Sequence, residues 1–147
     1  MRGQRGIEIN ALGRSRGGFS TKLHAVVDAR GQPLHIELSG GQQHEATRAQ
    51  SLVAKAQGRC CIADAGYDAD RIIAAIKARG MKAVIAPGGS RKGWRRRYDK
   101  KSYSVRFRVE IFFHHLKRCR RIATRYEKTA RNYLALVHLA CALLWVS

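Results

Sequence analysis

Residues 103–119 place charged and aromatic side chains at spacings that could serve chemistry on a phosphate group. At about 100° per residue in a helix, one face carries, within roughly 60° of one another, Tyr103, Arg106, Glu110 and Lys117. The opposite face is apolar and could pack on a core, with Val105, Val109, Phe112, Leu116 and Cys119. The polar face joins one carboxylate to three groups able to donate to phosphate. The alternative is an ordinary surface helix, in which Arg106 and Glu110 form an i, i+4 ion pair.

A second carboxylate, Asp64, directly follows the short apolar run 61–63. Ligands and catalytic groups gather at strand ends in open α/β sheets. An aspartate that caps a helix or a turn explains this position equally well. If Asp64 and Glu110 meet, the two carboxylates offer the hard oxygen ligands that Mg²⁺ prefers, and paired ions stabilise both the attacking and the leaving oxygen of a phosphodiester. Spacing alone does not show that they meet.

The charge of the chain points to a polyanionic partner. Its 147 residues include 29 Lys and Arg against 10 Asp and Glu, which gives a net charge of +19. Hydrophobic residues make up 45% of the chain, enough for a folded core, so a disordered basic tail is excluded. Nucleic acid is therefore the first partner to consider and an anionic membrane surface the second. Residues 91–131 hold 16 basic and three acidic residues, which predicts that the polyanion lies against this part of the chain.

A basic loop is predicted at residues 91–101, where aromatic residues are interleaved with basic ones. Its candidates for nucleic-acid contact are Trp94, Arg95, Arg96 and Arg97, with Tyr98 beside them. An aromatic ring can stack on a base while neighbouring Arg and Lys side chains hold phosphates, which is how single-stranded or distorted nucleic acid is bound. The alternative is a solvated charged surface, the usual meaning of such a run.

The elements that must position these residues alternate between strands and helices. Two antiparallel strands, joined by a turn at 29–32, are followed by helix, strand, helix and strand before the basic loop and the long helix. The expected strands are 19–28, 33–39, 60–63 and 81–86, and the expected helices before the loop are 44–57 and 69–79. This order predicts one α/β domain with mixed strand pairing.

Several other features have plain structural explanations. The four cysteines have no metal-finger spacing and are interpreted as buried thiols in a reducing cytosol, namely Cys60, Cys61, Cys119 and Cys141. His114 and His115 are not expected to share a metal ion, because adjacent helical residues point about 100° apart. Both are predicted to be surface histidines, and the alternative is that His114 contacts DNA. The apolar run 133–146 is shorter than the roughly 20 residues of a membrane span and predicts a core helix. Residues 1–10 lack the apolar stretch of a signal peptide.

The polar helix face also resembles a known signature. The chain matches the signature of bacterial insertion-sequence DDE transposases of families four and five at every fixed position. The matching residues are Tyr103, Arg106, Glu110 and Lys117, separated by two, three and six residues. Further blocks resemble family-five members in the same order, at residues 13–18, 21–24, 63–68 and 121–128. The resemblance extends from Ala11 to Trp145.

This resemblance implies a ribonuclease-H-like fold, a mixed sheet flanked by helices, whose acidic triad binds two Mg²⁺ ions and cuts and joins DNA. Asp64 would be the second acidic residue and Glu110 the third, both as metal ligands, while Tyr103, Arg106 and Lys117 would hold DNA phosphates. The implied partners are insertion-sequence ends and target DNA, with a homo-oligomer on the DNA, in the bacterial cytoplasm and associated with the nucleoid. Residues 1–18 would form a basic Gly/Arg-rich segment and 19–147 a partial catalytic domain.

The chain departs from the family at the first acidic residue, which lies on a strand before the block 13–18. Only Glu8 is acidic among the preceding residues, and Asp28 has the setting of a turn residue. We therefore expect the C-terminal part of a transposase, without its first strand, completed by an upstream segment that supplies the first Asp. A downstream reading frame joined by frameshifting and the remnant of an inactivated element both remain open. The alternative functions are a non-catalytic DNA-binding fragment or inhibitor and, third, a basic RNA-binding domain.

Overall fold

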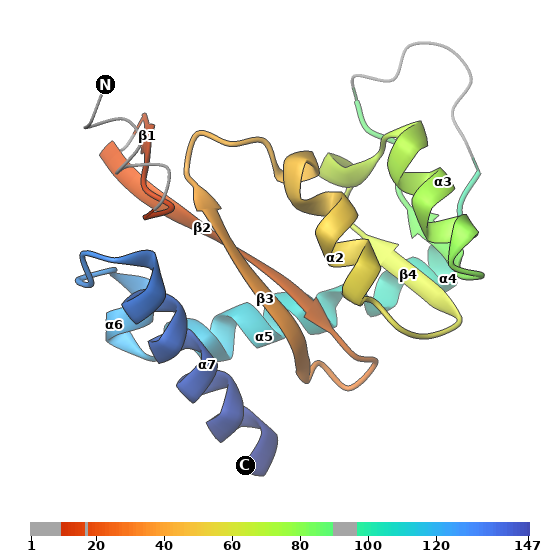
Figure 1. The fold of residues 1–147 in the computed structure, drawn as a ribbon. Helices are drawn as coiled ribbons and strands as arrows, with labels where there is room; N and C mark the ends of the chain where they lie inside the picture. The colour runs from red at the N-terminus through yellow and green to blue at the C-terminus, as the bar shows by residue number, and fades with distance from the viewer. Residues whose placement is uncertain (1–9, 17, 90–96) are drawn as a thin grey trace.

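The computed structural model describes residues 10–16, 18–89 and 97–147, and it confirms an α/β chain that combines strands and helices (Figure 1). Within these residues the strands form two separate sheets, one antiparallel with the order β1-β2-β3 and one parallel, β4-β5. The strands are β1 (Gly13–Ser15), β2 (Gly18–Val27), β3 (Pro33–Gly40), β4 (Cys60–Ala63) and β5 (Lys82–Ile85).

The hairpin of β2 and β3 forms as the sequence predicts. The Asp28 carboxylate accepts hydrogen bonds from the backbone N–H groups of Arg30 and Gln32, both at 2.8 Å, so Asp28 is a turn residue as expected. Gly31 has φ of 89°, a conformation that favours glycine. The two strands then pair in register from Thr21 opposite Gly40 to Val26 opposite His35.

The parallel pair is connected by a helix, as parallel strands require. β4 pairs with β5 from Cys60 opposite Lys82 to Ala63 opposite Ile85, and α3 (Asp70–Ala78) joins them. The predicted helix before β4 is a 3₁₀ turn, η1 (Glu45–Arg48), followed by α2 (Ala49–Lys55).

The long helix expected at 103–119 is divided. The sequence forms α4 (Lys100–Tyr103), a 3₁₀ turn η3 (Ser104–Arg106) and α5 (Phe107–Lys117), followed by α6 (Arg120–Ala123) and α7 (Ala130–Val146). Phe112 and Leu116 are buried as predicted. Val105 is exposed, contrary to prediction, because it lies in the 3₁₀ turn, where the 100° spacing of an α-helix does not hold.

The single mixed sheet that we expected does not form within the described residues. No described strand pairs with strands of both sets, so the antiparallel and the parallel strands stay in separate sheets. Two hydrophobic cores accompany them. The first packs α2 and α3 against β5, with Ala49, Val53, Ala56, Ile72, Ile73, Ile76, Met81 and Ile85. The second packs β3 against α5, α6 and α7, with Ile36, Phe112, Leu116, Ile122, Tyr133, Val137 and Cys141.

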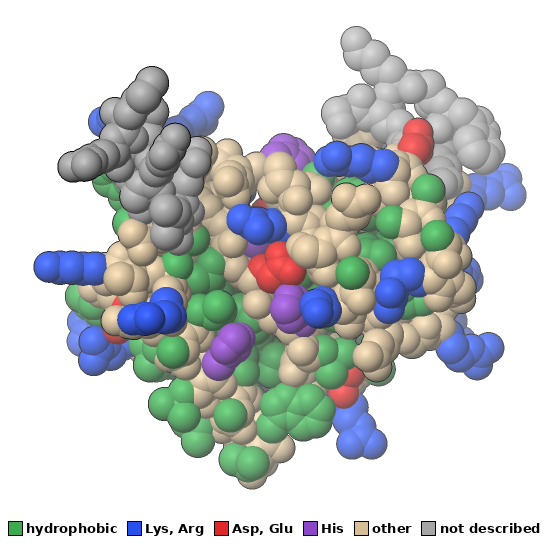
Figure 2. All heavy atoms as spheres, in the orientation of Figure 1, with side chains coloured by type: hydrophobic (Ala, Val, Ile, Leu, Met, Phe, Trp, Pro, Cys, Tyr) green, Lys and Arg blue, Asp and Glu red, His purple; other side chains and the backbone are tan. Residues whose placement is uncertain are grey.

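Two predictions about burial need correction. Cys60 is exposed at the start of β4 and Cys61 and Cys119 are only half-buried, so Cys141 alone among the four thiols is a buried one. The run 133–146 is helical, but α7 buries one face only, because it lies at the edge of the second core with nothing over its outer side in the described structure. Its exposed apolar residues are gathered towards the C-terminus (Figure 2), with Leu139, Leu143, Trp145 and Val146. No helix among the described residues is long and apolar enough to cross a membrane.

Candidate functional site

A cavity of about 840 Å³ lies between the two sheets and brings the predicted site residues together. β2 and β4 both line it, α2 and α3 contribute apolar side chains, and α5 contributes Val109 and Phe113. Four of the predicted residues line this one cavity, namely Asp64, Arg106, Glu110 and Lys117. The two carboxylates therefore reach a common space from separate elements, which the sequence spacing alone could not show.

Asp64 stands at the carboxyl end of β4 and also caps the turn that follows. Its Oδ1 accepts a hydrogen bond of 2.7 Å from the Ala65 N–H, at the start of η2 (Ala65–Tyr67). Asp64 therefore caps the turn, as one interpretation of the sequence predicted, and it also lines the cavity. The cap fixes the orientation of the carboxylate, because it holds one of the two oxygens against the backbone.

Glu110 lies one helical turn after Arg106, and the two form the i, i+4 ion pair of the surface-helix alternative, in which Arg106 Nη2 donates to Glu110 Oε1. The Arg106 guanidinium carbon also lies 5.7 Å from the centre of the Tyr103 ring, and Tyr103 makes an edge contact of 5.2 Å with Tyr98. Tyr103, Arg106 and Glu110 thus form a continuous row along one side of the helical segment.

Tyr103 does not line the cavity, but the charges of cavity residues affect the pKa of its phenol. Burial raises the pKa of the Tyr103 phenol, Arg106 opposes this, and the negative charge of Asp64 adds to the rise. The phenol is therefore neutral at physiological pH and can donate a hydrogen bond.

Three further polar residues in this region were not singled out from the sequence. Glu45 is a third carboxylate on the cavity wall, and His24 and Tyr67 line it as well. Burial, with the negative charges of Glu45 and Asp64, raises the pKa of Tyr67 to about 12. His24 lies in the block 21–24 that resembles the family, which was the one sequence signal for it. Glu45 has no recognisable spacing to Asp64 or Glu110 in the sequence. Within the described ranges, no three His, Cys, Asp or Glu side chains are arranged to hold a metal ion.

His24 is buried between two hydroxyl groups. Its Nε2 lies 2.7 Å from Ser39 Oγ and its Nδ1 lies 3.5 Å from the Tyr67 hydroxyl. Burial lowers the pKa of His24 below its usual value of 6.5, and the positive charge of Arg48 adds to this while Glu45 opposes it. The folded protein therefore holds this imidazole in its neutral form.

This burial predicts a loss of stability in mild acid. Between the lowered pKa and about 6.5, the unfolded chain binds more protons at this site than the folded chain, so the free energy of unfolding falls as pH decreases through that window. Urea unfolding at pH 7.5 and 5.5 should show a smaller pH dependence in His24→Gln than in the unsubstituted chain. His138→Gln, at an exposed position on α7, is the matched control. An unchanged pH dependence in His24→Gln would exclude this origin.

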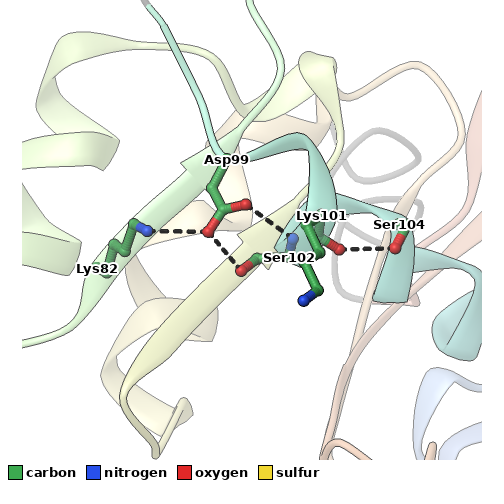
Figure 3. A network of polar contacts seen from close by, with 5 residues as sticks. All are labelled: Lys82, Asp99, Lys101, Ser102 and Ser104. Atoms are coloured by element: carbon green, nitrogen blue, oxygen red, sulfur yellow. Dashed lines mark hydrogen bonds and ion pairs between the residues drawn. The ribbon is translucent and has the colours of Figure 1, made fainter.

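Most of the predicted basic loop falls outside the described residues. Trp94, Arg95 and Arg96 belong to that part, whereas Arg97 is described and exposed. The described end of this segment is held to the parallel sheet by Asp99 (Figure 3). Its carboxylate accepts hydrogen bonds from the backbone N–H and hydroxyl of Ser102 and from Lys82 on β5, at 2.7 to 3.0 Å.

These contacts lower the pKa of Asp99, the Ser102 backbone bond most of all. A hydrogen bond of 2.6 Å from Ser104 Oγ to the Lys101 carbonyl oxygen continues the network into η3 (Figure 3). The start of the site-bearing segment is thereby fixed to β5.

The comparisons with known proteins identify the family of the chain. The family profile described as "Transposase DDE domain" matches residues 4–145. The chain belongs to the DDE transposase family. It is 44% identical over 131 residues to a putative transposase for insertion sequence element IS6501 from Brucella ovis, which covers 87% of this chain and 99% of the relative.

A second relative is longer than the chain. Identity is 30% over 147 residues to a putative transposase for insertion sequence element IS402 from Burkholderia cepacia, covering 92% of this chain but 66% of that protein. No solved structure matches. The family acts in DNA transposition, and its members typically use divalent metal ions.

Proposed function

We propose that this DDE transposase chain contributes to Mg²⁺-dependent cleavage and strand transfer at insertion-sequence ends. The observation that supports this most strongly is the shared cavity, in which Asp64 and Glu110 come from β4 and α5 and are accompanied by Arg106 and Lys117. Carboxylates alone would be repelled by DNA phosphates, and the basic side chains beside them offset that repulsion.

The donor set fits a hard divalent cation. Asp64 and Glu110 would hold Mg²⁺ through carboxylate oxygens, which are the ligands this ion prefers. When bound, the ion supplies charge stabilisation to the phosphodiester and activates a water molecule or a DNA 3′-hydroxyl. Glu110 is oriented for this role by Arg106, and Asp64 by its bond to the Ala65 N–H.

The remaining site residues would position DNA. Lys117 and Arg106 would bind phosphate oxygens beside the carboxylates, and Tyr103, which is neutral, would donate a hydrogen bond to a third phosphate oxygen. Arg97, which is exposed, would add a further DNA contact. Trp94, Arg95 and Arg96, which lie outside the described residues, are proposed to bind DNA from their sequence alone. The reacting phosphate would thus be held on the carboxylate side of the cavity.

The proposed fold is ribonuclease-H-like and lacks its first strand. Residues 19–147 would form the partial catalytic domain after a basic segment at 1–18. The first acidic residue of the triad would come from an upstream transposase segment, and a homo-oligomer would assemble on the DNA in the bacterial cytoplasm, at the nucleoid. The two predicted carboxylates on the cavity wall support this assignment.

The test is a strand-transfer assay on labelled insertion-sequence ends, with the upstream segment supplied and Mg²⁺ present or absent. We expect joined DNA products only when both the upstream segment and Mg²⁺ are present, and no joined products with the Glu110→Gln variant. Equal products with Glu110→Gln would show that Glu110 is not part of the site.

A second candidate is a non-catalytic DNA-binding fragment, or an inhibitor that occupies transposon ends. It is favoured by the lack, within the described residues, of a group of three His, Cys, Asp or Glu side chains that could hold a metal ion. The two candidates differ in one outcome, because only the enzyme shows Mg²⁺-dependent cleavage when the upstream segment is supplied. Preference for structured RNA over element DNA would instead support the RNA-binding alternative.

Both candidates predict that DNA affinity depends steeply on salt. A protein that makes about six phosphate contacts loses roughly a thousandfold in affinity between 50 and 200 mM salt, because bound counterions are released. Lys117→Gln should lower the slope of log affinity against log salt by about one, since one phosphate contact is lost. The matched control is Lys77→Gln, an exposed lysine on α3 away from the cavity. Equal slopes for both variants would remove Lys117 from the interface.

A further inference from the structure

The turn that follows Asp64 is attached to both sheets through side chains. The last residue of η2, Tyr67, places its phenol oxygen 3.5 Å from Nδ1 of His24 on β2. The next residue, Asp68, accepts a hydrogen bond of 2.8 Å at Oδ2 from the backbone N–H of Gly88, which follows β5. One contact therefore ties the turn to the parallel sheet that leads to Asp64, and the other ties it to the antiparallel sheet.

Backbone hydrogen bonds join this turn and Asp64 into one unit. The Tyr67 N–H donates to the Asp64 carbonyl oxygen at 2.9 Å, and the Asp68 N–H donates to the Ala65 carbonyl oxygen at 3.0 Å. The Asp64 carboxylate accepts a third bond, from the Ala65 N–H. Because these bonds join residues at most three positions apart, a displacement of Tyr67 is passed on to Asp64. A contact made by the Tyr67 hydroxyl thus acts on the position of the Asp64 carboxylate.

His24 has a fixed orientation within the antiparallel sheet. Its Nε2 lies 2.7 Å from Ser39 Oγ on β3, and the two residues are only 3% and 1% exposed. A buried neutral imidazole has one donor and one acceptor, so it donates to one of its two hydroxyl partners and accepts from the other. Because β2 and β3 pair with each other on both sides of His24, the ring is anchored in this sheet. The contact with Tyr67 extends the anchored network to the turn.

The strand that carries His24 also supports Glu110. α5, which contains Glu110, packs against β2, whereas β4, which leads to Asp64, does not pair with β2 in the described structure. Apolar packing of α2 against β2 and α3 brings these elements together. Such packing is non-directional, whereas a hydrogen bond has a preferred distance and angle. Polar contacts such as that between His24 and Tyr67 therefore set the direction of Asp64 relative to Glu110.

We propose that His24 is a positioning residue, which acts through the Tyr67 hydroxyl and η2 to hold the Asp64 carboxylate where it can share one divalent ion with Glu110. The proposal rests on the proposed function, because it takes Asp64 and Glu110 as the metal ligands. His24 and Tyr67 line the same cavity, and they act on the ligand rather than on the ion. Partners that orient a metal ligand typically change metal affinity by about 10- to 100-fold.

Tyr67→Phe tests the contact by removing the hydroxyl and keeping the ring. Mn²⁺ binding is measured by electron paramagnetic resonance, with end DNA bound and the upstream segment supplied. We expect Mn²⁺ affinity to fall by about tenfold and DNA affinity to stay unchanged, because the lost hydroxyl orients a metal ligand and binds no phosphate. His138→Gln, at an exposed position on α7, is the control and should keep both affinities. Unchanged Mn²⁺ affinity in Tyr67→Phe would overturn the proposal.

Two substitutions of His24 separate positioning from a purely structural role. His24→Asn places the amide where Nδ1 lies, so it keeps a contact with Tyr67 and loses the bond to Ser39. His24→Gln extends the amide to the place of Nε2, which keeps the Ser39 bond and loses the Tyr67 contact. We expect Mn²⁺ affinity to fall by about tenfold in His24→Gln and to stay near that of the unsubstituted chain in His24→Asn. Equal losses, or a greater loss in His24→Asn, would mean a structural role and overturn the proposal.

A measurement without DNA or metal separates this proposal from the proposed function. Amide hydrogen exchange at Ala65 and Tyr67, whose N–H groups bond to Asp64, reports how firmly the turn is held. Both rates are taken relative to that of Ile76 in the core, so that a general loss of stability cancels. We expect relative exchange to quicken by about tenfold in His24→Gln and to stay unchanged in His24→Asn.

The two readouts together decide between the outcomes. Unchanged relative exchange at Ala65 and Tyr67 in His24→Gln would overturn the proposal. Faster exchange in that variant, with no Mn²⁺ binding by the unsubstituted chain, would refute the proposed function and leave His24 as the anchor of the Asp64 turn.

Discussion

Asp64→Asn is expected to abolish Mg²⁺-dependent cleavage of insertion-sequence DNA while leaving DNA affinity unchanged or slightly higher. Asn accepts the same hydrogen bond from the Ala65 N–H, so the turn after β4 keeps its cap. The variant loses only the negative charge, which a metal ligand needs and which repels DNA phosphates. Metal-assisted charge stabilisation is worth several kcal/mol, so the cleavage rate should fall by about a thousandfold or more. Cleavage of labelled ends, with the upstream segment supplied, and filter binding measure the two quantities.

Asp70→Asn is the matched control for this experiment. Asp70 is an exposed aspartate in the first turn of α3 and does not line the cavity. Its substitution makes the same chemical change six residues further along the chain, and both cleavage and affinity should remain. A full cleavage rate in Asp64→Asn would mean that this carboxylate serves only as a cap.

Leu116→Ala should lower the free energy of unfolding by about 3 kcal/mol. The Leu116 side chain is 1% exposed at the centre of the second core, on the face of α5 that packs against the rest of this core. Its truncation leaves a cavity that surrounding helices fill only in part. Urea unfolding followed by circular dichroism measures the loss, and the same core supports the helix that carries Glu110 and Lys117.

The matched control is Ile111→Ala on the same helix. Ile111 is 43% exposed, so truncation removes little buried area and should cost less than about 1 kcal/mol. Equal losses for the two variants would mean that α5 is not held by the second core.

The sequence predicted helices, strands and turns well where interactions between residues close in the chain determine them. The Asp28 turn uses hydrogen bonds within four residues, and the strand at 60–63 forms at the predicted bounds. Tertiary arrangement decided the rest. Val105 is exposed because a 3₁₀ turn changes the helical spacing, and the predicted single mixed sheet is divided into two sheets in the described residues.

The candidate site could be predicted only in part, because helical spacing predicts neighbours within one helix but not contacts between separate elements. Helical spacing places Arg106 beside Glu110, and their ion pair forms. That Asp64 reaches the same cavity depends on how the β4 end packs near η3, which spacing cannot show. Glu45 and Tyr67 come together only through tertiary packing, since the two residues lie on different 3₁₀ turns.

The central claim is that Asp64 and Glu110 hold one divalent ion, and Mn²⁺ binding tests it most directly. Mn²⁺ accepts the same carboxylate ligands as Mg²⁺ and is detected by electron paramagnetic resonance. With end DNA bound and the upstream segment supplied, the chain should bind Mn²⁺ more tightly than the DNA alone does. Asp64→Asn and Glu110→Gln should each weaken that binding by about tenfold or more, the cost of a lost ligand. Unchanged Mn²⁺ affinity in either variant would contradict a shared metal site.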